Sequence, residues 1–467
     1  MSTTPSDRWR RAYVLGLGLS GTAAVRLLLH LGVEVIASDR RAAGELELAG
    51  LAGAPGLELR LGVEDAELPA GLDALVVSPG VAPGHPLLTV ARAAGVPVVA
   101  EVELAFRHLD GTIVAVTGSN GKSTTTALAG ALVSGAGLAV EICGNIGLPL
   151  ASVVDGAPGR IFVVELSSFQ LETIDRFRPR AAALLNLSPD HLDRHGDLAG
   201  YLAAKRRVFE NQRGDDVAVL NADDPEVAGI DVAGRRRQFS RLGAVVDGCF
   251  LAGDAVVERA PGGRDQTLFR LADLPLPGPH NLENAMAAAL LARAVDVGAE
   301  TMPATLARFR GLPHRLERVG ERAGVVFYDD SKGTNVAATA RSLEGFDDGS
   351  VHLILGGRNK GADFRFLREI VARKARRAYL IGESAAALER ALAGTAELVA
   401  SGTLEAAVDA AARAARAGES VVLSPACASF DQFEDYVDRG RSFQRAVLER
   451  IGAPAGERGG GGQEARL

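Results

Sequence analysis

Lysine is scarce in this chain. Of its 51 basic residues only five are lysines, and the other 46 are arginines. A chain with this bias keeps a lysine either by chance or because the position requires an amine rather than a guanidinium. Five positions are therefore candidates for amine chemistry: Lys122, Lys205, Lys332, Lys360 and Lys374.

Cysteine and uninterrupted apolar runs are also scarce. The three cysteines have no C-x-x-C spacing, which argues against a zinc site or a disulfide framework and favours a reduced, cytoplasmic protein. The apolar stretch 13–36 contains Arg26 and His30, so we expect neither a targeting nor a membrane-spanning segment. The net charge of −7 argues against a nucleic-acid-binding protein that relies on a strongly basic domain.

Short apolar runs alternate with helical stretches along most of the 467 residues, enough chain for about three domains. This alternation predicts an α/β protein with parallel sheets covered by helices on both faces. Residues 243–279 differ, because alternating Val, Phe and Leu around two consecutive glycines indicate an antiparallel insertion. The glycine-rich residues 456–467 are predicted to be a disordered tail. Candidate strands are 12–16, 33–37, 74–78, 112–117, 161–165, 181–186, 217–221, 351–356 and 420–424.

A glycine-rich turn, Gly16-x-Gly18-x-x-Gly21, follows the first predicted strand and opens a predicted helix. Such a turn lets the backbone approach an anionic ligand at the helix N-terminus. Asp39 follows 18 residues after Gly21, close to the spacing of a ribose-binding carboxylate. The pattern fits an NAD-dependent dehydrogenase, but it also fits another nucleotide or a tight turn with no ligand.

A second phosphate-type loop is more specific. A buried strand ends at Thr117, and Gly118-Ser119-Asn120-Gly121-Lys122-Ser123-Thr124 leads into a helix. Backbone amides of such a loop hold phosphates, the lysine neutralises the β- and γ-phosphates, and a hydroxyl of Ser123 or Thr124 can hold Mg²⁺. The loop is a shortened Walker motif, because Val116 stands where the full motif has its first glycine. A dehydrogenase does not require this second loop.

Two further strand ends carry possible metal ligands. Glu165 ends one buried strand, and His191 follows another, in the segment Asp190-His-Leu-Asp-Arg-His195. The carboxyl ends of strands in an open α/β sheet gather ligand-binding groups at one edge, so we expect Glu165 and His191 to hold Mg²⁺. His195 has no independent predicted role.

These motifs, taken together, resemble those of the Mur ligase family, and the resemblance covers nearly the whole chain. It rests on nine segments: Thr117–Thr124, Gly144–Gly147, Glu165–Gln170, Asp190–Arg194, Tyr201–Lys205, His280–Asn284, Gly311–Arg315, Asp330–Asn335 and Ser424–Phe433. Among the members of the family, the chain most resembles those that join D-glutamate to UDP-N-acetylmuramoyl-L-alanine.

The resemblance implies three domains: a Rossmann-like UDP-substrate domain at 1–101, a central ATP-binding domain at 102–311 and a Rossmann-like amino-acid domain at 312–455. The central domain would be a P-loop-type parallel sheet carrying the antiparallel insertion. ATP would phosphorylate the substrate carboxylate to an acyl phosphate, which the D-glutamate amine attacks. Negative charge accumulates in this reaction, so positioned cations should supply most of the catalysis.

The resemblance also implies binding residues. ATP would contact Gly118 to Thr124, Asn281, Arg315 and Asp330. The UDP substrate would contact Gly18, Leu19, Ser20, Asp39, Arg40, Ser78, Gly80 and Asn145. D-Glutamate would contact Lys332, Thr334, Lys360, Ser429 and Tyr436, the last of which is commonly phenylalanine in the family. The catalytic set would be Lys122, Glu165, His191 and Lys205.

Lys205 has a special implied role. By resemblance its amine takes up carbon dioxide and becomes a carbamate that, with Ser123, Glu165 and His191, positions one of two Mg²⁺ ions. The alternative is an ordinary surface lysine on a helix. Arginine could not serve, because its guanidinium stays protonated. Four of the five lysines thus acquire roles, and only Lys374 has none.

Two other functions remain open at this stage. A sister Mur ligase would add a different amino acid, although Leu355–Asp363 lacks the D-N-P-R motif found where diaminopimelate or lysine is added. An NAD-dependent dehydrogenase is the more distant alternative. In either ligase case we expect a monomer that acts on small molecules in the cytoplasm.

Overall fold

The computed structural model describes residues 9–46, 48, 50–64, 67–154, 158–276, 278–359 and 361–452. Its chain forms two compact units. Of the residues that the structure describes, the first unit contains 9–274 and Glu283–Ala307, and the second contains Pro275–Leu282 and 308–452. Among the described residues no helix is both long and apolar enough to cross a membrane.

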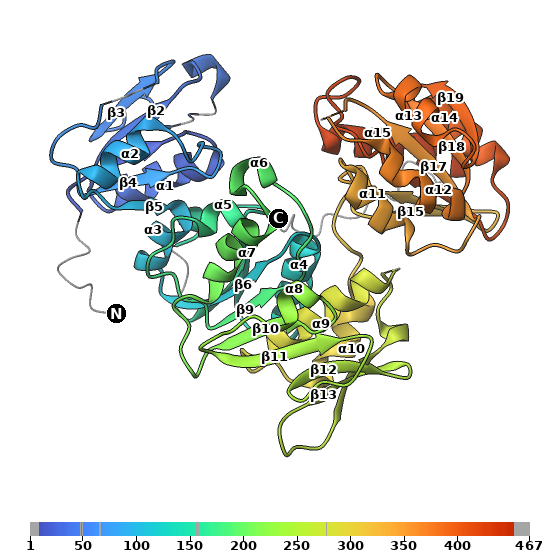
Figure 1. Ribbon diagram of the computed structural model, residues 1–467, viewed down its shortest axis with the longest axis horizontal. Coiled ribbons are helices and arrows are strands. Elements are labelled where there is room, and N and C mark those ends of the chain that lie inside the picture. Colours follow the sequence, from blue (N-terminus) through green and yellow to red (C-terminus); the bar gives the residue numbers. More distant parts are fainter. Residues whose placement is uncertain are drawn as a thin grey trace. The chain divides into compact units, whose positions relative to one another are not determined.

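The first unit begins with a parallel five-stranded sheet in the order β3-β2-β1-β4-β5 (Figure 1). The order reverses beside β1, which opens a crevice beyond the carboxyl ends of β1 and β4, as in a Rossmann fold. The strands are β1 Arg11–Leu15, β2 Glu34–Asp39, β3 Leu57–Leu61, β4 Ala74–Val77 and β5 Val98–Ala100. The helices are α1 Leu19–His30, α2 Pro86–Ala93 and α3 Glu101–His108.

A nine-stranded sheet follows in the order β14-β13-β12-β11-β10-β9-β6-β8-β7. Its strands are parallel from β7 to β12, and β12, β13 and β14 form the predicted antiparallel insertion. The strands are β6 Gly111–Thr117, β7 Val140–Gly144, β8 Arg160–Glu165, β9 Ala181–Leu184, β10 Val217–Asn221, β11 Arg235–Ser240, β12 Gly248–Ala252, β13 Ala255–Arg259 and β14 Gln266–Arg270. The helices are α4 Lys122–Gly135, α5 Ser168–Leu171, α6 Leu192–His195, α7 Leu198–Arg206, α8 Pro225–Ala228, α9 Pro279–Arg293 and α10 Met302–Arg308.

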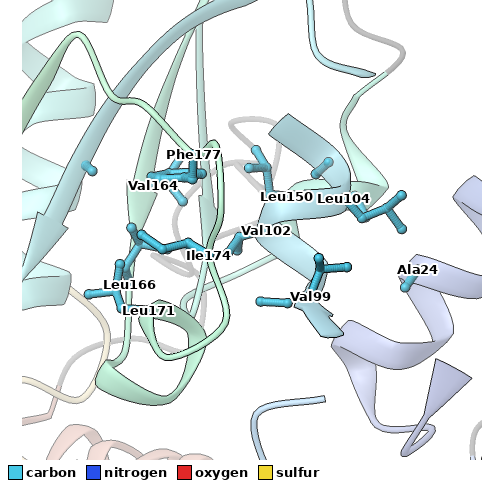
Figure 2. Close-up of a cluster of buried hydrophobic side chains, with 14 of the residues drawn as sticks. Ala24, Val99, Val102, Leu104, Leu150, Val164, Leu166, Leu171, Ile174 and Phe177 are labelled. Atoms are coloured by element: carbon cyan, nitrogen blue, oxygen red, sulfur yellow. The ribbon is translucent and has the colours of Figure 1, made fainter. Parts of the chain in front are cut away.

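A continuous apolar core joins these two sheets. Figure 2 shows Val102 of α3 between Leu150, which follows β7, and Ile174, which follows α5, and Ala24 of α1 belongs to the same cluster. Burying such side chains contributes roughly 1.5–3 kcal/mol for each large one, so this core holds the two sheets in one unit.

The second unit contains a six-stranded sheet in the order β15-β16-β20-β17-β18-β19. All pairs are parallel except the β15–β16 hairpin, which was not predicted. The strands are β15 Glu317–Arg322, β16 Val325–Asp329, β17 Val351–Gly356, β18 Ala375–Ile381, β19 Glu397–Gly402 and β20 Ser420–Leu423. The helices are α11 Val336–Leu343, α12 Arg368–Lys374, α13 Ala385–Leu392, α14 Leu404–Ala414 and α15 Tyr436–Ile451.

The predicted fold class is confirmed: the chain is α/β, with three mainly parallel sheets and an antiparallel insertion in the central one. Each of the nine predicted strands exists, within about two residues at either end. The predicted tail, 456–467, lies outside the described residues.

Candidate active site

A cavity of about 660 Å³ lies at the carboxyl ends of β1, β2 and β4, and we call it the strand-edge cavity. Asn145, from the loop after β7, also lines it. The cavity wall therefore contains every residue predicted for the UDP end of the substrate: Gly18, Leu19, Ser20, Asp39, Arg40, Ser78, Gly80 and Asn145.

The glycine-rich turn forms one side of the strand-edge cavity. Gly16 has φ +88°, and a Cβ on Gly21 would lie 1.8 Å from the Gly16 carbonyl oxygen. Ser78 Oγ donates a hydrogen bond of 2.7 Å to the same oxygen, which ties β4 to the turn. Only glycine fits such close backbone packing, so this turn has the predicted geometry.

Asp39 holds the turn from the other side. Its carboxylate accepts hydrogen bonds from the Leu17 amide (2.7 Å) and from the backbone and guanidinium of Arg41. The hydrogen bonds from the Arg41 side chain are the largest cause of a pKa lowered to about 2, so the carboxylate stays ionised. Arg41 also lines the cavity. Sequence reasoning named its neighbour Arg40 and missed Arg41, although both follow Asp39 directly.

The phosphate-type loop connects β6 to α4. Gly118 and Gly121 have φ +152° and +82°. The Lys122 Nζ lies over the loop and donates to the carbonyls of Gly118 and Ser119, both at 3.0 Å. The amide of Asn120 donates to Asn186 Oδ1 at 2.9 Å, so the segment after β9 supports the loop. The Lys122 side chain thus folds back over a loop whose backbone amides are of the kind that bind phosphate.

A second cavity, of about 270 Å³, is lined by three of the four predicted catalytic residues, Lys122, His191 and Lys205, and we call it the lysine cavity. Its wall comes from several elements and contains Pro79, Gly80, Lys122, Asn145, Ser167, Ser168, Phe169, His191, Tyr201 and Lys205. Pro79, Gly80 and Asn145 also line the strand-edge cavity, so the two cavities adjoin.

Glu165 lies at the end of β8, behind Asn145. Its Oε1 accepts a hydrogen bond of 2.8 Å from Asn145 Nδ2, whereas its buried Oε2 has no hydrogen-bond partner within the described part of the chain. A buried, unpartnered carboxylate oxygen is costly unless a cation binds it. The residue therefore fits a metal ligand.

His191 and Lys205 take up unusual positions. His191 has φ +53° at the start of α6, and its ring packs on Phe169 with a centroid distance of 4.8 Å. Lys205 is 1% exposed, so it is not a surface lysine. Its Nζ donates to the Gly118 carbonyl at 2.8 Å and lies 4.5 Å from the centre of the Tyr201 ring, one helical turn away on α7.

The Lys205 amine is driven toward its neutral form. Burial is the first cause and the nearby Lys122 charge the second, and together they lower the pKa of Lys205 to about 6. A neutral amine at physiological pH is a nucleophile, which an ordinary exposed lysine is not.

The second unit brings two residues of the predicted D-glutamate set, Lys332 and Tyr436, into contact. The Lys332 Nζ lies 3.7 Å from the centre of the Tyr436 ring, and Ser429 is buried in the loop after β20. Arg439, which sequence reasoning missed, donates to Ser331 and to the Cys427 carbonyl and so joins the two loops. Thr334 follows Lys332 in the same loop, and Lys360 lies outside the described residues.

The predicted ATP-binding set is divided between the units. Lys122 belongs to the first unit, whereas Asn281, Arg315 and Asp330 belong to the second. Asp330 is buried and accepts hydrogen bonds of 2.7 Å from Ser342 Oγ and Ser424 Oγ. Burial raises the pKa of Asp330 to about 6, and the nearby Arg315 charge opposes that rise.

Three regions of the chain match families of known domains. Residues 10–100 match the Mur ligase MurD-like N-terminal domain, residues 116–292 the Mur ligase middle domain, and residues 314–427 the Mur ligase glutamate ligase domain.

Curated relatives match over nearly the full length. The UDP-N-acetylmuramoylalanine--D-glutamate ligase of Acidobacterium capsulatum is 43% identical over 452 residues, which cover 96% of this chain and 98% of the relative. The enzyme of the same name from Myxococcus xanthus is 46% identical over 456 residues, which cover 94% and 98%.

Solved structures with lower identity share the fold. The UDP-N-acetylmuramate-alanine ligase of Thermotoga maritima has a TM-score of 0.59 at 18% identity, covering 95% of this chain and 100% of that one. The MurF ligase of Thermotoga maritima, in complex with ADP, has a TM-score of 0.58 at 17% identity, covering 95% and 97%.

Proposed function

The chain belongs to the Mur ligase family, and we propose that it joins D-glutamate to UDP-N-acetylmuramoyl-L-alanine, with ATP converted to ADP and phosphate, in peptidoglycan precursor synthesis. One structural observation carries the proposal: the strand-edge cavity and the lysine cavity share Gly80 and Asn145. A long substrate can therefore place its UDP end among glycines and Arg41 while its carboxylate reaches the lysines. Membership of the family excludes the dehydrogenase.

The chemistry follows from these two cavities. The Lys122 ammonium neutralises charge on the γ-phosphoryl group while the substrate carboxylate attacks it, which forms the acyl phosphate and releases ADP. The amine of D-glutamate then attacks the acyl carbon, loses a proton, and phosphate leaves. Asn145 and Gly80, which line both cavities, would hold the muramoyl-peptide portion so that the carboxylate lies in line with the phosphoryl group.

We assign Mg²⁺ to Ser123, Glu165, His191 and the Lys205 carbamate. The unpartnered Glu165 Oε2 supports this assignment, as does the imidazole of His191 in the same region. Bound Mg²⁺ would offset the charge that accumulates on the phosphoryl and carboxylate oxygens. Two ions are proposed, the second between ATP and the substrate carboxylate.

The carbamate itself is a testable part of the proposal. A Lys205 amine with a pKa of about 6 is largely neutral at pH 7.5 and can attack carbon dioxide, forming an N–C bond and releasing one proton. Intact-mass measurement under native conditions should find one added carbon dioxide, and short carboxylates should restore activity to Lys205→Ala. A fully active Lys205→Ala enzyme with no added mass would contradict the role.

D-Glutamate is assigned to the second unit. Lys332 and Lys360 supply positive charge for its two carboxylates, and Thr334 and Ser429 supply hydroxyls. The Tyr436 ring would form the wall of this site, since it already packs against Lys332.

The decisive experiment measures phosphate release from ATP with UDP-N-acetylmuramoyl-L-alanine and a panel of D- and L-amino acids. We expect release only when D-glutamate and the UDP substrate are both present. Release with another amino acid and none with D-glutamate would indicate a sister ligase, and no release with any acceptor would refute the ligase proposal. The predicted cytoplasmic location, monomeric state and domain boundaries stay predictions.

A further inference from the structure

Arg194 connects the walls of the two cavities. It lies on α6, and its Nη1 donates to the carbonyl oxygens of Pro79 (3.2 Å) and Val81 (3.0 Å), in the loop after β4. Its Nε and Nη2 donate to the Glu172 carboxylate, at 3.1 and 2.6 Å. All three guanidinium nitrogens are thus in use, and the contacts join the five-stranded sheet to the segment after α5.

The loop held by Arg194 belongs to both cavities. Pro79 and Gly80 line the strand-edge cavity and the lysine cavity, and Val81 lines the former. The loop keeps its own conformation through other contacts, because the Ser78 amide donates to the Leu15 carbonyl and Ser78 Oγ to Gly16. Arg194 therefore fixes where this loop lies relative to the lysine cavity rather than how the loop is folded.

The ion pair of Arg194 and Glu172 also contacts residues that line the lysine cavity or adjoin it. The Arg194 guanidinium lies 4.2 Å from the centre of the Phe169 ring. Glu172 also pairs with His195 Nδ1 at 3.4 Å, and His195 Nε2 lies 3.0 Å from Ser168 Oγ. Phe169 and Ser168 both line the lysine cavity, so one charged pair supports two of its wall residues.

Arg194 is also tied to a proposed metal ligand. Its amide and that of His195 both donate to the His191 carbonyl at 3.1 Å, which makes α6 a single compact turn. These two bonds use backbone atoms alone, so a substitution of the Arg194 side chain leaves His191 in place and releases only Phe169 and the Pro79–Val81 loop.

We infer that Arg194, held by Glu172, is a positioning residue that sets the span between the strand-edge cavity and the lysine cavity, and so selects a substrate long enough to occupy both at once. The inference rests on the proposed function, because a two-ended UDP substrate is what makes the span matter. The planar guanidinium suits this role because it serves a carboxylate and two carbonyls simultaneously, which an ammonium on a flexible stem does not.

The test measures how Arg194→Met affects two ligands: UDP, which would occupy only the strand-edge cavity, and UDP-N-acetylmuramoyl-L-alanine, which would occupy both cavities. UDP alone fills only the strand-edge cavity, so its Kd from calorimetry should stay within about twofold of wild type. The KM for UDP-N-acetylmuramoyl-L-alanine should rise about tenfold or more, as expected for the loss of charge-assisted hydrogen bonds. The KM for ATP should stay within about twofold. Arg194→Lys keeps the charge but should retain most of the KM increase.

Arg107→Met is the matched control. The Arg107 side chain is 8% exposed, against 14% for Arg194, and it pairs with Glu103 and Asp175, both at 2.8 Å, where the five-stranded sheet packs on the segment after α5. It lines neither cavity. The control variant should lower the melting temperature and leave the KM for the UDP substrate within about twofold.

Several results would overturn the inference. These are an unchanged KM for the UDP substrate in Arg194→Met, an equal loss of affinity for UDP alone, full recovery by lysine, or the same KM increase in Arg107→Met. Failure of the proposed function is a different result, because there the wild-type enzyme itself releases no phosphate with the UDP substrate and D-glutamate.

Discussion

The Lys205 amine makes the folded protein sensitive to pH in a definite direction. Its pKa falls from the ordinary 10.5 to about 6 on folding. Between these values the unfolded chain binds more protons at this site than the folded chain, so the stability contributed by Lys205 rises with pH across that window. Below about pH 6 the amine is charged in both the folded and the unfolded chain, and the folded protein is destabilised by the full free energy of burying that charge.

Replacing Lys205 with methionine should remove this dependence. Met has a similar length and no charge, so Lys205→Met should be more stable than wild type at pH 7, and the advantage should shrink by roughly 2.7 kcal/mol by pH 9. The free energy of unfolding is measured by urea denaturation at pH 7 and pH 9 in buffer free of carbon dioxide. Hydrogen exchange of the α7 amides shows whether the transition unfolds the unit that contains Lys205. A difference between the proteins that does not change with pH would contradict the burial argument.

At the scale of single residues, the sequence motifs identified candidate site residues but not the burial and contacts of their side chains. Lys122, His191 and Lys205, which the family resemblance placed in one catalytic set, line the same cavity, and their roles stay predictions. The burial of Lys205 and the contacts of Arg194 were not predicted. Both depend on segments far apart in the chain, such as α6 and the loop after β4, whose approach no local pattern encodes.

At the scale of elements, the β6–α4 connection depends on a left-handed residue at its end. Gly121 has φ +82° and precedes the first residue of α4. A Cβ there would lie 2.2 Å from Asn284 Oδ1, and Asn284 Oδ1 also accepts a hydrogen bond from Thr125 Oγ1. The loop and α9 therefore pack so closely that they exclude a side chain at this position.

Gly121→Ala should consequently impair nucleotide binding as well as stability. The strained backbone alone costs about 1–3 kcal/mol, and the clash with Asn284 should displace the phosphate-binding amides. We expect the KM for ATP to rise at least tenfold. Gly137→Ala, just beyond the other end of α4, is the control: φ is +78° there, but no atom lies within 4 Å of the added Cβ. It should lose stability and keep its KM for ATP, and equal KM values in the two variants would refute the argument.

Two strands rich in charged residues were not predicted. β11 begins Arg235-Arg236-Arg237, which does not look like an interior strand, yet it lies between β10 and β12. Its buried Arg237 is neutralised by Asp247 and Glu258, from the chain around β12 and β13. A sequence pattern cannot show such pairing in advance. The same applies to β15, whose alternating charges resemble a surface loop until β16 pairs with it.

At the scale of the whole molecule, the predicted binding residues are divided between the two compact units. Lys122 and Lys205 belong to the first unit, whereas Arg315, Asp330 and Lys332 belong to the second. Within the second unit, Asp330 and Lys332 are already held in place by Ser424, Ser342 and Tyr436. Each half is thus organised separately before substrates bind.

Bound substrates should therefore hold the two units in one arrangement. The proposed reaction requires Lys122, Arg315 and Asp330 to contact the same ATP, so the two units must be closed around it when the substrates react. We expect X-ray scattering to show a smaller radius of gyration with a non-hydrolysable ATP analogue, Mg²⁺ and the UDP substrate together than with any one alone. Arg315→Ala should weaken this change without altering the profile of the free protein. An identical profile in all states would mean that free and bound enzyme share one arrangement, and closure would then contribute nothing to catalysis.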